Sequence, residues 1–284
     1  MKSAEHVSRL LLWSRGYRSK RVSTSAGSVH YMSCKGGGSL PPIVLLHGLG
    51  SAGAHYGPLL RHLRKKVQEV IIIDFPGHGF SRHSGVALDA ELFRVSVQEA
   101  LDQIIQKPVI LYGNSLGGLA ALRYSLLKPE LITSLIVCSP GGAPMTPVEK
   151  DALFSLFTPM NHEACLEFVD RLFARRYGTR HFFGVGVRWV LRDETVQSLL
   201  RSLDENVMLT AEEISELSVP TLCVWGKADG ILPRTGAEFF RRNLPATKVQ
   251  FSSPDDFGHS PHLEFPRRVA NQIIQFAQGE VLET

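Results

Sequence analysis

Cysteine is scarce in this chain. There are four among 284 residues, Cys34, Cys138, Cys165 and Cys223, and no two of them form a C-x-x-C pair. Cys138 and Cys223 lie inside apolar runs, where cysteine behaves as a small buried hydrophobe. This pattern argues against a metal centre or a disulfide framework. Reduced thiols fit a cytoplasmic protein, which is the location we expect.

The N-terminal region has no long apolar run. Its apolar stretch, residues 10–13, is too short for a signal-peptide core or a membrane span. The region is basic, with Arg9, Arg15, Arg18, Lys20 and Arg21. It could contact an anionic membrane surface, but we favour a solvated helix that leads into the domain. The formal net charge of +4 is too small to argue for nucleic acid, and no binding motif accompanies it, so we expect no nucleic-acid partner.

Short apolar runs alternate with longer helical patterns along most of the chain. The runs that predict buried strands cover residues 42–47, 70–75, 108–112, 135–138 and 221–225, with outer strands at 29–34 and 248–252. Helical patterns cover residues 88–106, 116–127, 235–243 and 266–278. This alternation predicts an α/β fold with a mostly parallel sheet and helices on both faces.

One segment, residues 144–218, interrupts the alternation. It contains helical patterns at 148–157 and 163–177 but no convincing strand, so we predict a helical cap inserted over the sheet. The chain then divides into a basic N-terminal segment (1–28), a first core part (29–143), the cap (144–218) and a second core part (219–284).

The strongest local signal is Gly113-Asn114-Ser115-Leu116-Gly117, which matches G-x-S-x-G between a predicted strand and a predicted helix. A sharp strand-to-helix turn brings residues 113 and 117 so close together that a Cβ on either would clash. The serine hydroxyl is left at the helix N-terminus, where the helix dipole favours developing negative charge. Ser115 is therefore the candidate nucleophile. The alternative is a glycine-rich helix start with a capping serine.

A serine hydroxyl needs a base to become a good nucleophile. His259 follows the last predicted strand and precedes the last helix, which places it at the carboxyl edge of the sheet; His262 is its nearest competitor. Asp229 follows the strand at 221–225 and a glycine turn. It would fix the imidazole tautomer and stabilise the imidazolium, although by itself it also fits a turn-forming or capping aspartate.

The sequence His47-Gly48-Leu49-Gly50 follows the first central strand. Glycines there allow a backbone N–H to point into the site, so we predict that the amides of Leu49 and Leu116 form an oxyanion hole. We expect His47 to be structural, hydrogen-bonding nearby loops.

Together these residues resemble the α/β-hydrolase superfamily over about residues 29–278. Four landmarks follow the family order: HGLG at 47–50, DFPGHGFS at 74–81, GNSLGG at 113–118 and GHSPHLEFP at 258–266. The last selects His259 over His262, and it makes Glu264 and Pro266 helix-start residues. The resemblance implies the α/β-hydrolase fold, the family's chain order of serine, acid and histidine, and no cofactor or metal. A serine at the elbow excludes the relatives that use an aspartate nucleophile.

Within this superfamily we expect a carboxylic ester hydrolase that forms an acyl-enzyme intermediate on a small-molecule ester. An ester with an apolar acyl chain is one candidate. Further candidates for substrate contact are Gly48, Asn114, Arg188 and Trp189. Cap aromatic residues that could line an acyl pocket, or pack within the cap, are Phe154, Phe157, Phe168, Phe173, Phe182, Phe183 and Trp189.

Two alternatives stay open. Gly113-Asn114-Ser115 and the stretch 139–142 also resemble carbon–carbon bond hydrolases of vinylogous keto acids, whose carboxylate Arg188 or Arg192 could hold. Those enzymes usually carry tryptophan where this chain has Ser260. The second alternative is a non-catalytic binding protein of the same fold, but such proteins usually lose part of the triad, and all three residues are present here.

Overall fold

The computed structural model describes residues 2–85, 87–159, 161–203 and 207–282. Its strands are β1 (Arg18–Thr24), β2 (Gly27–Lys35), β3 (Ile43–Leu46), β4 (Glu69–Ile73), β5 (Arg82–His83), β6 (Val109–Asn114), β7 (Ile132–Cys138), β8 (Thr221–Val224) and β9 (Val249–Ser252). Its core helices are α1 (Lys2–Ser14), α2 (Gly57–Leu63), α3 (Ala90–Ile104), α4 (Leu116–Leu127), α10 (Arg234–Asn243), α11 (Pro261–Glu264) and α12 (Pro266–Ala277), with 3-10 helices η1 (Gly53–Tyr56) and η2 (Pro129–Leu131). Between β7 and β8 lie α5 (Pro147–Phe157), α6 (His162–Leu172), α7 (Arg180–Val190), α8 (Glu194–Arg201) and α9 (Ala211–Ser215).

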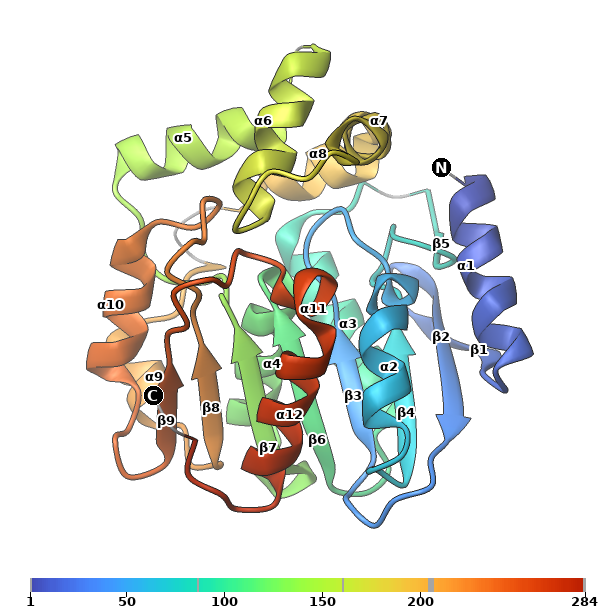
Figure 1. The fold of residues 1–284 in the computed structure, drawn as a ribbon, viewed down its shortest axis with the longest axis vertical. Helices are drawn as coiled ribbons and strands as arrows, with labels where there is room; N and C mark the ends of the chain where they lie inside the picture. The colour runs from blue at the N-terminus through green and yellow to red at the C-terminus, as the bar shows by residue number, and fades with distance from the viewer. Residues whose placement is uncertain (1, 86, 160, 204–206, 283–284) are drawn as a thin grey trace.

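The sheet has the order β1-β2-β4-β3-β6-β7-β8-β9, with β5 paired to β2. In this order, the neighbouring strands β4, β3, β6, β7, β8 and β9 pair in parallel, whereas β2 pairs antiparallel with β1, β4 and β5. Helices cover both faces (Figure 1). The mostly parallel sheet predicted from sequence is therefore confirmed.

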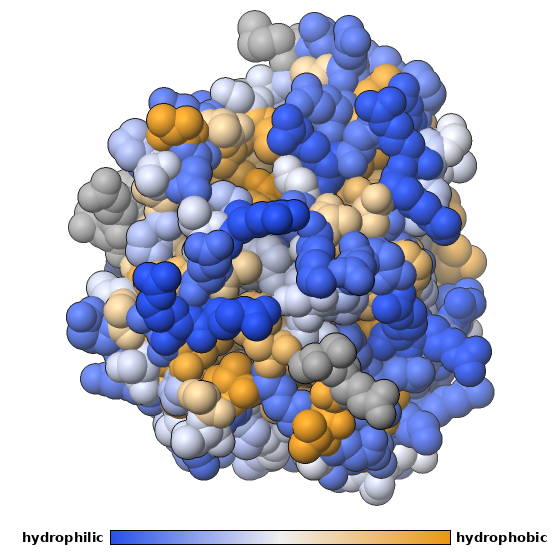
Figure 2. All heavy atoms as spheres, turned by 60° about the vertical axis from the view of Figure 1, so that its left-hand side comes forward, coloured by the Kyte–Doolittle hydropathy of each residue, from blue (hydrophilic) through white to orange (hydrophobic). Residues whose placement is uncertain are grey.

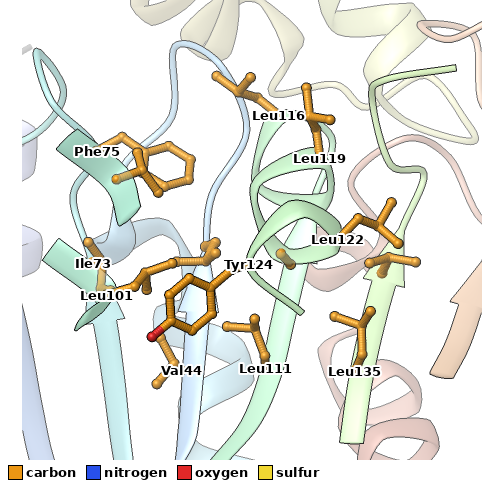
Figure 3. Packing of buried hydrophobic residues seen from close by; sticks show 14 of the residues in the cluster. Val44, Ile73, Phe75, Leu101, Leu111, Leu116, Leu119, Leu122, Tyr124 and Leu135 are labelled. Atoms are coloured by element: carbon orange, nitrogen blue, oxygen red, sulfur yellow. The ribbon is translucent and has the colours of Figure 1, made fainter. Parts of the chain in front are cut away.

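The sheet's two faces bury two separate apolar clusters because side chains alternate along each strand. In β3, Val44 and Leu46 pack with α3 and α4, whereas Ile43 and Leu45 pack with α2 and α12. Figure 3 shows the first cluster, in which side chains of α4 meet those of the central strands. This double coverage explains why the strand sequences are apolar at successive positions.

The segment between β7 and β8 lies above the carboxyl ends of the parallel strands, except for its last part (Figure 1). There α9 packs beside α10, and Leu209, Ile214 and Leu217 join the core cluster that covers α3 and α4. The final residues of the predicted cap thus belong to the main core by their packing. The division of the chain into segments stays a prediction.

The N-terminal segment differs from the solvated helix expected for it. Helix α1 is present, but β1 follows it and pairs along its whole length with β2. Most of the β1 side chains are exposed, because β1 is an edge strand, and such a strand lacks the apolar run that marks its buried neighbours.

Candidate active site

Ser115 stands at the junction of β6 and α4 in a backbone conformation that non-glycine residues rarely adopt, with φ 57° and ψ −119°. A Cβ at Gly113 would lie 2.1 Å from the carbonyl oxygen of Gly117, and one at Gly117 would lie 2.2 Å from that of Leu46. Backbone atoms therefore leave no room for a Cβ at either position, as predicted from the sequence. This close packing holds Ser115 at the start of the helix.

Asp229 and His259 form a buried pair in which a carboxylate oxygen lies 2.8 Å from Nδ1 of the imidazole. The same aspartate accepts hydrogen bonds from the backbone N–H groups of Ile231 and Leu232 at 2.9 and 3.1 Å. Burial raises the pKa of Asp229, but the charge and hydrogen bond of His259 oppose it, and the net effect lowers the pKa. An ionised Asp229 makes Nδ1 the donor and leaves Nε2 as the basic nitrogen.

Two backbone contacts hold His259 in place. The side-chain amide of Asn114 donates to the carbonyl oxygens of His259 and Cys138 at 2.9 and 3.0 Å, and the His259 N–H donates to Leu172 of α6 at 3.0 Å. Asn114, predicted to contact substrate, is instead buried, and its amide ties the end of β6 to the loop of His259. Its sequence neighbourhood gave no signal of this role, because the partner lies 145 residues away.

His47 holds the loop that follows β3. Its Nε2 accepts the N–H of Phe75 at 3.0 Å, so Nδ1 carries the proton that is donated to the Gly48 carbonyl at 2.8 Å. Burial lowers the pKa of His47 to about 3, so the ring is neutral and suited to both contacts. The structural role expected for His47 agrees with these hydrogen bonds.

His78 supports the same loop from the turn that follows β4. Its Nδ1 donates to the Pro76 carbonyl at 2.9 Å, and its Nε2 accepts the N–H of Gly50 at 3.1 Å. That turn is organised by the buried Asp74, whose carboxylate accepts the N–H groups of Gly53 and Phe80 at 2.8 and 2.9 Å. Sequence reasoning assigned no role to Asp74 or His78, although both lie in the DFPGHGFS motif.

The predicted oxyanion donors flank Ser115. A Cβ at Gly48 would lie 3.2 Å from the Ser115 Cβ, and Leu49 and Leu116 line the same cavity as Ser115. Within the part of the chain that the structure describes, neither the Leu49 N–H nor the Leu116 N–H has a protein acceptor. Two unused backbone donors beside a serine are what an oxyanion hole requires.

The cavity at Ser115 is narrow, with a volume of about 80 Å³, and its walls are mostly apolar. Leu119 of α4 and Trp225, which follows β8, line it from the core, and the cap supplies Leu153, Phe157 and Leu200. Of the seven cap aromatic residues considered above, Phe157 alone is among the described lining residues. Phe168 and Phe173 are buried, and Phe168 packs edge-on against Phe157 at 5.1 Å between ring centroids.

The structure does not bring Arg188 and Trp189 to this cavity. Both are exposed on α7, Trp189 by 66%, and neither lines the space beside Ser115. Because a helix presents successive residues to different sides, their position in the cap did not determine the direction in which they point.

The loops that carry Asp229 and His259 are tied to the cap through the end of α6. The carbonyl of Arg171 accepts the N–H of Gly230 at 3.2 Å. The carboxylate of Glu264 accepts from the Ala174 N–H at 3.1 Å and from the Tyr177 hydroxyl at 3.0 Å. Glu264 therefore links the histidine loop to the cap, a role beyond the helix start expected for it. Pro266 does begin α12.

Two further residues complete the surroundings: Ser139, for which the sequence predicted no contact with Asp229, and His262, the competitor of His259. Ser139 is fully buried at φ 41°, and its hydroxyl helps to lower the pKa of Asp229. His262 is buried 4.7 Å from the Tyr56 ring and has no acid partner among the described ion pairs, unlike His259. No group of three potential metal ligands occurs among the described residues, and none of their helices is long and apolar enough to cross a membrane.

Comparisons with known proteins identify the family of this chain. The profile of the Alpha/beta hydrolase family matches residues 43–272. The chain is 23% identical over 269 residues to Monoacylglycerol lipase ABHD6 of Homo sapiens, covering 84% of this chain and 76% of that one. It is 26% identical over 256 residues to the pimeloyl-[acyl-carrier protein] methyl ester esterase of Vibrio vulnificus, covering 84% and 95%.

Among solved structures, carboxylesterase CesB from Bacillus subtilis superposes with a TM-score of 0.78 at 23% identity, covering 98% of this chain and 97% of that one. This likeness shows a shared fold. With a family profile that spans most of the chain, the sheet, the elbow and the Asp229–His259 pair have a common explanation: the chain belongs to the alpha/beta hydrolase family.

Proposed function

We propose that this protein is a serine esterase that uses Ser115 as nucleophile, His259 as general base and Asp229 as the acid that orients the histidine. The observation that carries the proposal is the buried Asp229–His259 pair, at 2.8 Å, in a fold that ties the His259 loop to the nucleophile strand through Asn114. The names of the two relatives, a monoacylglycerol lipase and a methyl ester esterase, support ester hydrolysis.

In the first half of the reaction, the Ser115 hydroxyl attacks the ester carbonyl while His259 Nε2 takes its proton. The Leu49 and Leu116 N–H groups donate to the oxyanion of the tetrahedral intermediate. The tetrahedral intermediate then collapses: the bond to the alkoxy oxygen breaks, His259 gives its proton to that oxygen, and the alcohol leaves. The acyl group remains on Ser115 as an ester. In the second half, His259 Nε2 takes a proton from water while the water oxygen attacks that ester. His259 then returns the proton to the Ser115 oxygen, which releases the carboxylic acid and restores the Ser115 hydroxyl.

The apolar walls of the cavity favour an apolar acyl group, and its small volume favours a short one unless the cap moves. Phe157 and Leu153 of α5 lie on the cap side of this space. The size of the acyl group is therefore expected to depend on α5.

The test is hydrolysis of p-nitrophenyl esters from acetate to laurate by the wild type and by Ser115→Ala. Removing the nucleophile is expected to lower kcat by about a million-fold, which leaves only the catalysis that the oxyanion hole and substrate binding supply. A fluorophosphonate probe is expected to label the wild type and not the variant. Equal turnover by both proteins would contradict the assignment of Ser115.

The alternatives predict other outcomes of the same test. A carbon–carbon bond hydrolase would turn over a ring-fission keto acid and leave the esters intact. However, Arg188 and Arg192, the residues expected to hold its carboxylate, do not line the described cavity. A binding protein would turn over neither substrate although correctly folded.

A further inference from the structure

Helix α1 carries its apolar stripe on the side that faces water. Val7, Leu10 and Leu11 occur at helical spacing and are 55%, 58% and 52% exposed. Leu12, on the opposite side, is 3% exposed. A surface helix of a globular protein normally turns such a stripe toward the core.

The rotation of α1 about its axis is fixed by contacts on its inner side. The guanidinium of Arg9 lies over the Phe80 ring at 4.3 Å, and the His6 ring lies 4.9 Å from the same ring. Together with the buried Leu12, these contacts leave Val7, Leu10 and Leu11 outward. The exposed stripe is therefore a property of how the helix docks.

Helix α7 of the cap has a second outward stripe. Phe182, Val185 and Trp189 follow the same helical spacing and are 77%, 52% and 66% exposed. The other side of α7 packs inward, since a Cβ at Gly184 would lie 2.8 Å from the Leu166 side chain of α6. In Figure 1 the N-terminal end of α1 rises toward the level of α7, at the cap end of the molecule.

Basic side chains accompany the stripe of α1. Arg15, Arg18, Lys20 and Arg21 follow it and are exposed. None of the ion pairs between described residues involves any of them. Trp13, 58% exposed, lies between the stripe and these cations, and Arg18 is 5.6 Å from its ring. By contrast, hydrophilic residues dominate the face in Figure 2, where apolar residues form small separate patches.

We propose that α1 and α7 dock this protein on an anionic phospholipid surface. Apolar side chains with tryptophan on one face of a helix, flanked by arginine and lysine, are the composition that inserts shallowly at a bilayer interface. The cations without carboxylate partners complement lipid phosphates and carboxylates. The stripes lie on the outer sides of two separate helices, and this geometry fits a broad surface better than a protein anchor inserted into a pocket.

The two exposed tryptophans provide a direct test. Trp13 and Trp189 face outward, whereas Trp225, the third tryptophan of the chain, is buried. Adding vesicles of equimolar phosphatidylcholine and phosphatidylserine to the full chain is expected to shift tryptophan emission to the blue. Trp13→Phe and Trp189→Phe each remove part of that shift. No shift at low salt, with no co-sedimentation, would overturn the proposal.

Matched variants separate the contributions of the two apolar stripes and of the cations to vesicle binding. Leu10→Ser/Leu11→Ser and Phe182→Ser/Trp189→Ser are each expected to weaken vesicle binding by about tenfold or more. Arg15→Gln/Lys20→Gln is expected to lose about tenfold on anionic vesicles only. Leu127→Ser and Val148→Ser, at exposed apolar positions of α4 and α5, serve as controls without effect. Unchanged binding of either stripe variant would overturn the assignment of its helix.

The remaining outcomes are equally decisive. Ser115→Ala is expected to bind vesicles as the wild type does, so docking and hydrolysis can fail separately. Equal binding to vesicles of phosphatidylcholine alone would overturn the role of charge. Concentration-dependent dimerisation that the stripe variants abolish, with no vesicle binding, would assign the stripes to a second copy of the chain and overturn the lipid proposal.

Discussion

At the scale of a single residue, Asp229 is kept ionised by its partner against the effect of burial. Asp229→Asn retains the size of the side chain but replaces an acceptor with a group that can stabilise the wrong imidazole tautomer. We expect kcat to fall by about 10⁴-fold, as in other triads. The measurement is kcat on p-nitrophenyl acetate, with circular dichroism to confirm the fold. A fall of less than about tenfold would remove Asp229 from the triad.

The burial of the His262 side chain is expected to make the stability of the protein depend on pH. Burial, with His55 and His259 nearby, lowers its pKa to about 3 from the ordinary value of 6.5. Between these values the unfolded chain holds a proton that the folded protein does not, so the free energy of unfolding falls as pH is lowered through this window. One such histidine contributes at most about 1.4 kcal/mol per pH unit.

His262→Phe keeps an aromatic ring against Tyr56 and removes the titration. We expect denaturant unfolding of this variant to lose less stability than the wild type does between about pH 6.5 and about pH 4. His181→Phe, at an exposed position of α7, is the control. Parallel pH profiles for wild type and His262→Phe would show that this group does not set the acid sensitivity.

At the scale of an element, the strand-to-helix turn at Ser115 depends on backbone clearance. A methyl group at Gly113 would lie 2.1 Å from the Gly117 carbonyl oxygen, so Gly113→Ala must displace the elbow. We expect about 1–3 kcal/mol of lost stability and a fall in kcat/KM of about a hundredfold. Gly57→Ala, where a Cβ meets nothing within 4 Å, is the matched control. If both variants behaved alike in unfolding and esterase assays, close approach at the elbow would not be the reason for glycine.

The link between the cap and the histidine loop is a second element-scale feature. Glu264→Ala leaves the Ala174 N–H without its carboxylate acceptor, at an expected cost of about 1–3 kcal/mol in unfolding free energy. Hydrogen exchange at residues 172–177 is expected to rise, and kcat to fall, because Leu172 holds the His259 N–H. Tyr177→Phe removes only the hydroxyl contact and should have a smaller effect. Unchanged exchange in Glu264→Ala would contradict this link.

Burial and chain-distant contacts decide which of these elements could be predicted from the sequence. The central strands were predicted because burial on both faces makes them continuously apolar, as in β3. Strand β1 was missed because its exposed polar residues give no such signal. The predicted helix at 163–177 extends past α6, which ends at Leu172, where that residue's carbonyl accepts the N–H groups of His259 and Ser260. A local sequence pattern carries no information about partners that lie so far away in the chain.

The same limit applies at the candidate site. The motifs around Ser115 and His259 identified residues that the fold then places on neighbouring loops, because strand ends of a parallel sheet share one edge. Asn114 and Arg188 were assigned by type and position alone, and their side chains point elsewhere. Function at these positions depends on three-dimensional direction. The cytoplasmic location also stays a prediction.

At the scale of the whole molecule, the proposed docking surface and the proposed active site meet at α7. Its outward stripe faces solvent, whereas its inner side reaches the loop that follows β3: a Cβ at Gly50 would lie 2.7 Å from the Val190 side chain. Val190 and Leu49 also pack in one apolar cluster. A lipid surface that contacts α7 would therefore lie one helix away from the loop that flanks Ser115.

This arrangement predicts that docking matters only for substrates presented in lipid. Because their changes lie on outward side chains, Leu10→Ser/Leu11→Ser and Phe182→Ser/Trp189→Ser should hydrolyse dissolved p-nitrophenyl acetate at the wild-type kcat/KM. On the longest p-nitrophenyl ester that the wild type hydrolyses, carried in anionic vesicles, their rates should fall about tenfold, in proportion to lost binding. Equal losses on both substrates would instead indicate damage to the site. Wild-type rates on vesicles, despite lost binding, would show that hydrolysis does not depend on the membrane-bound protein.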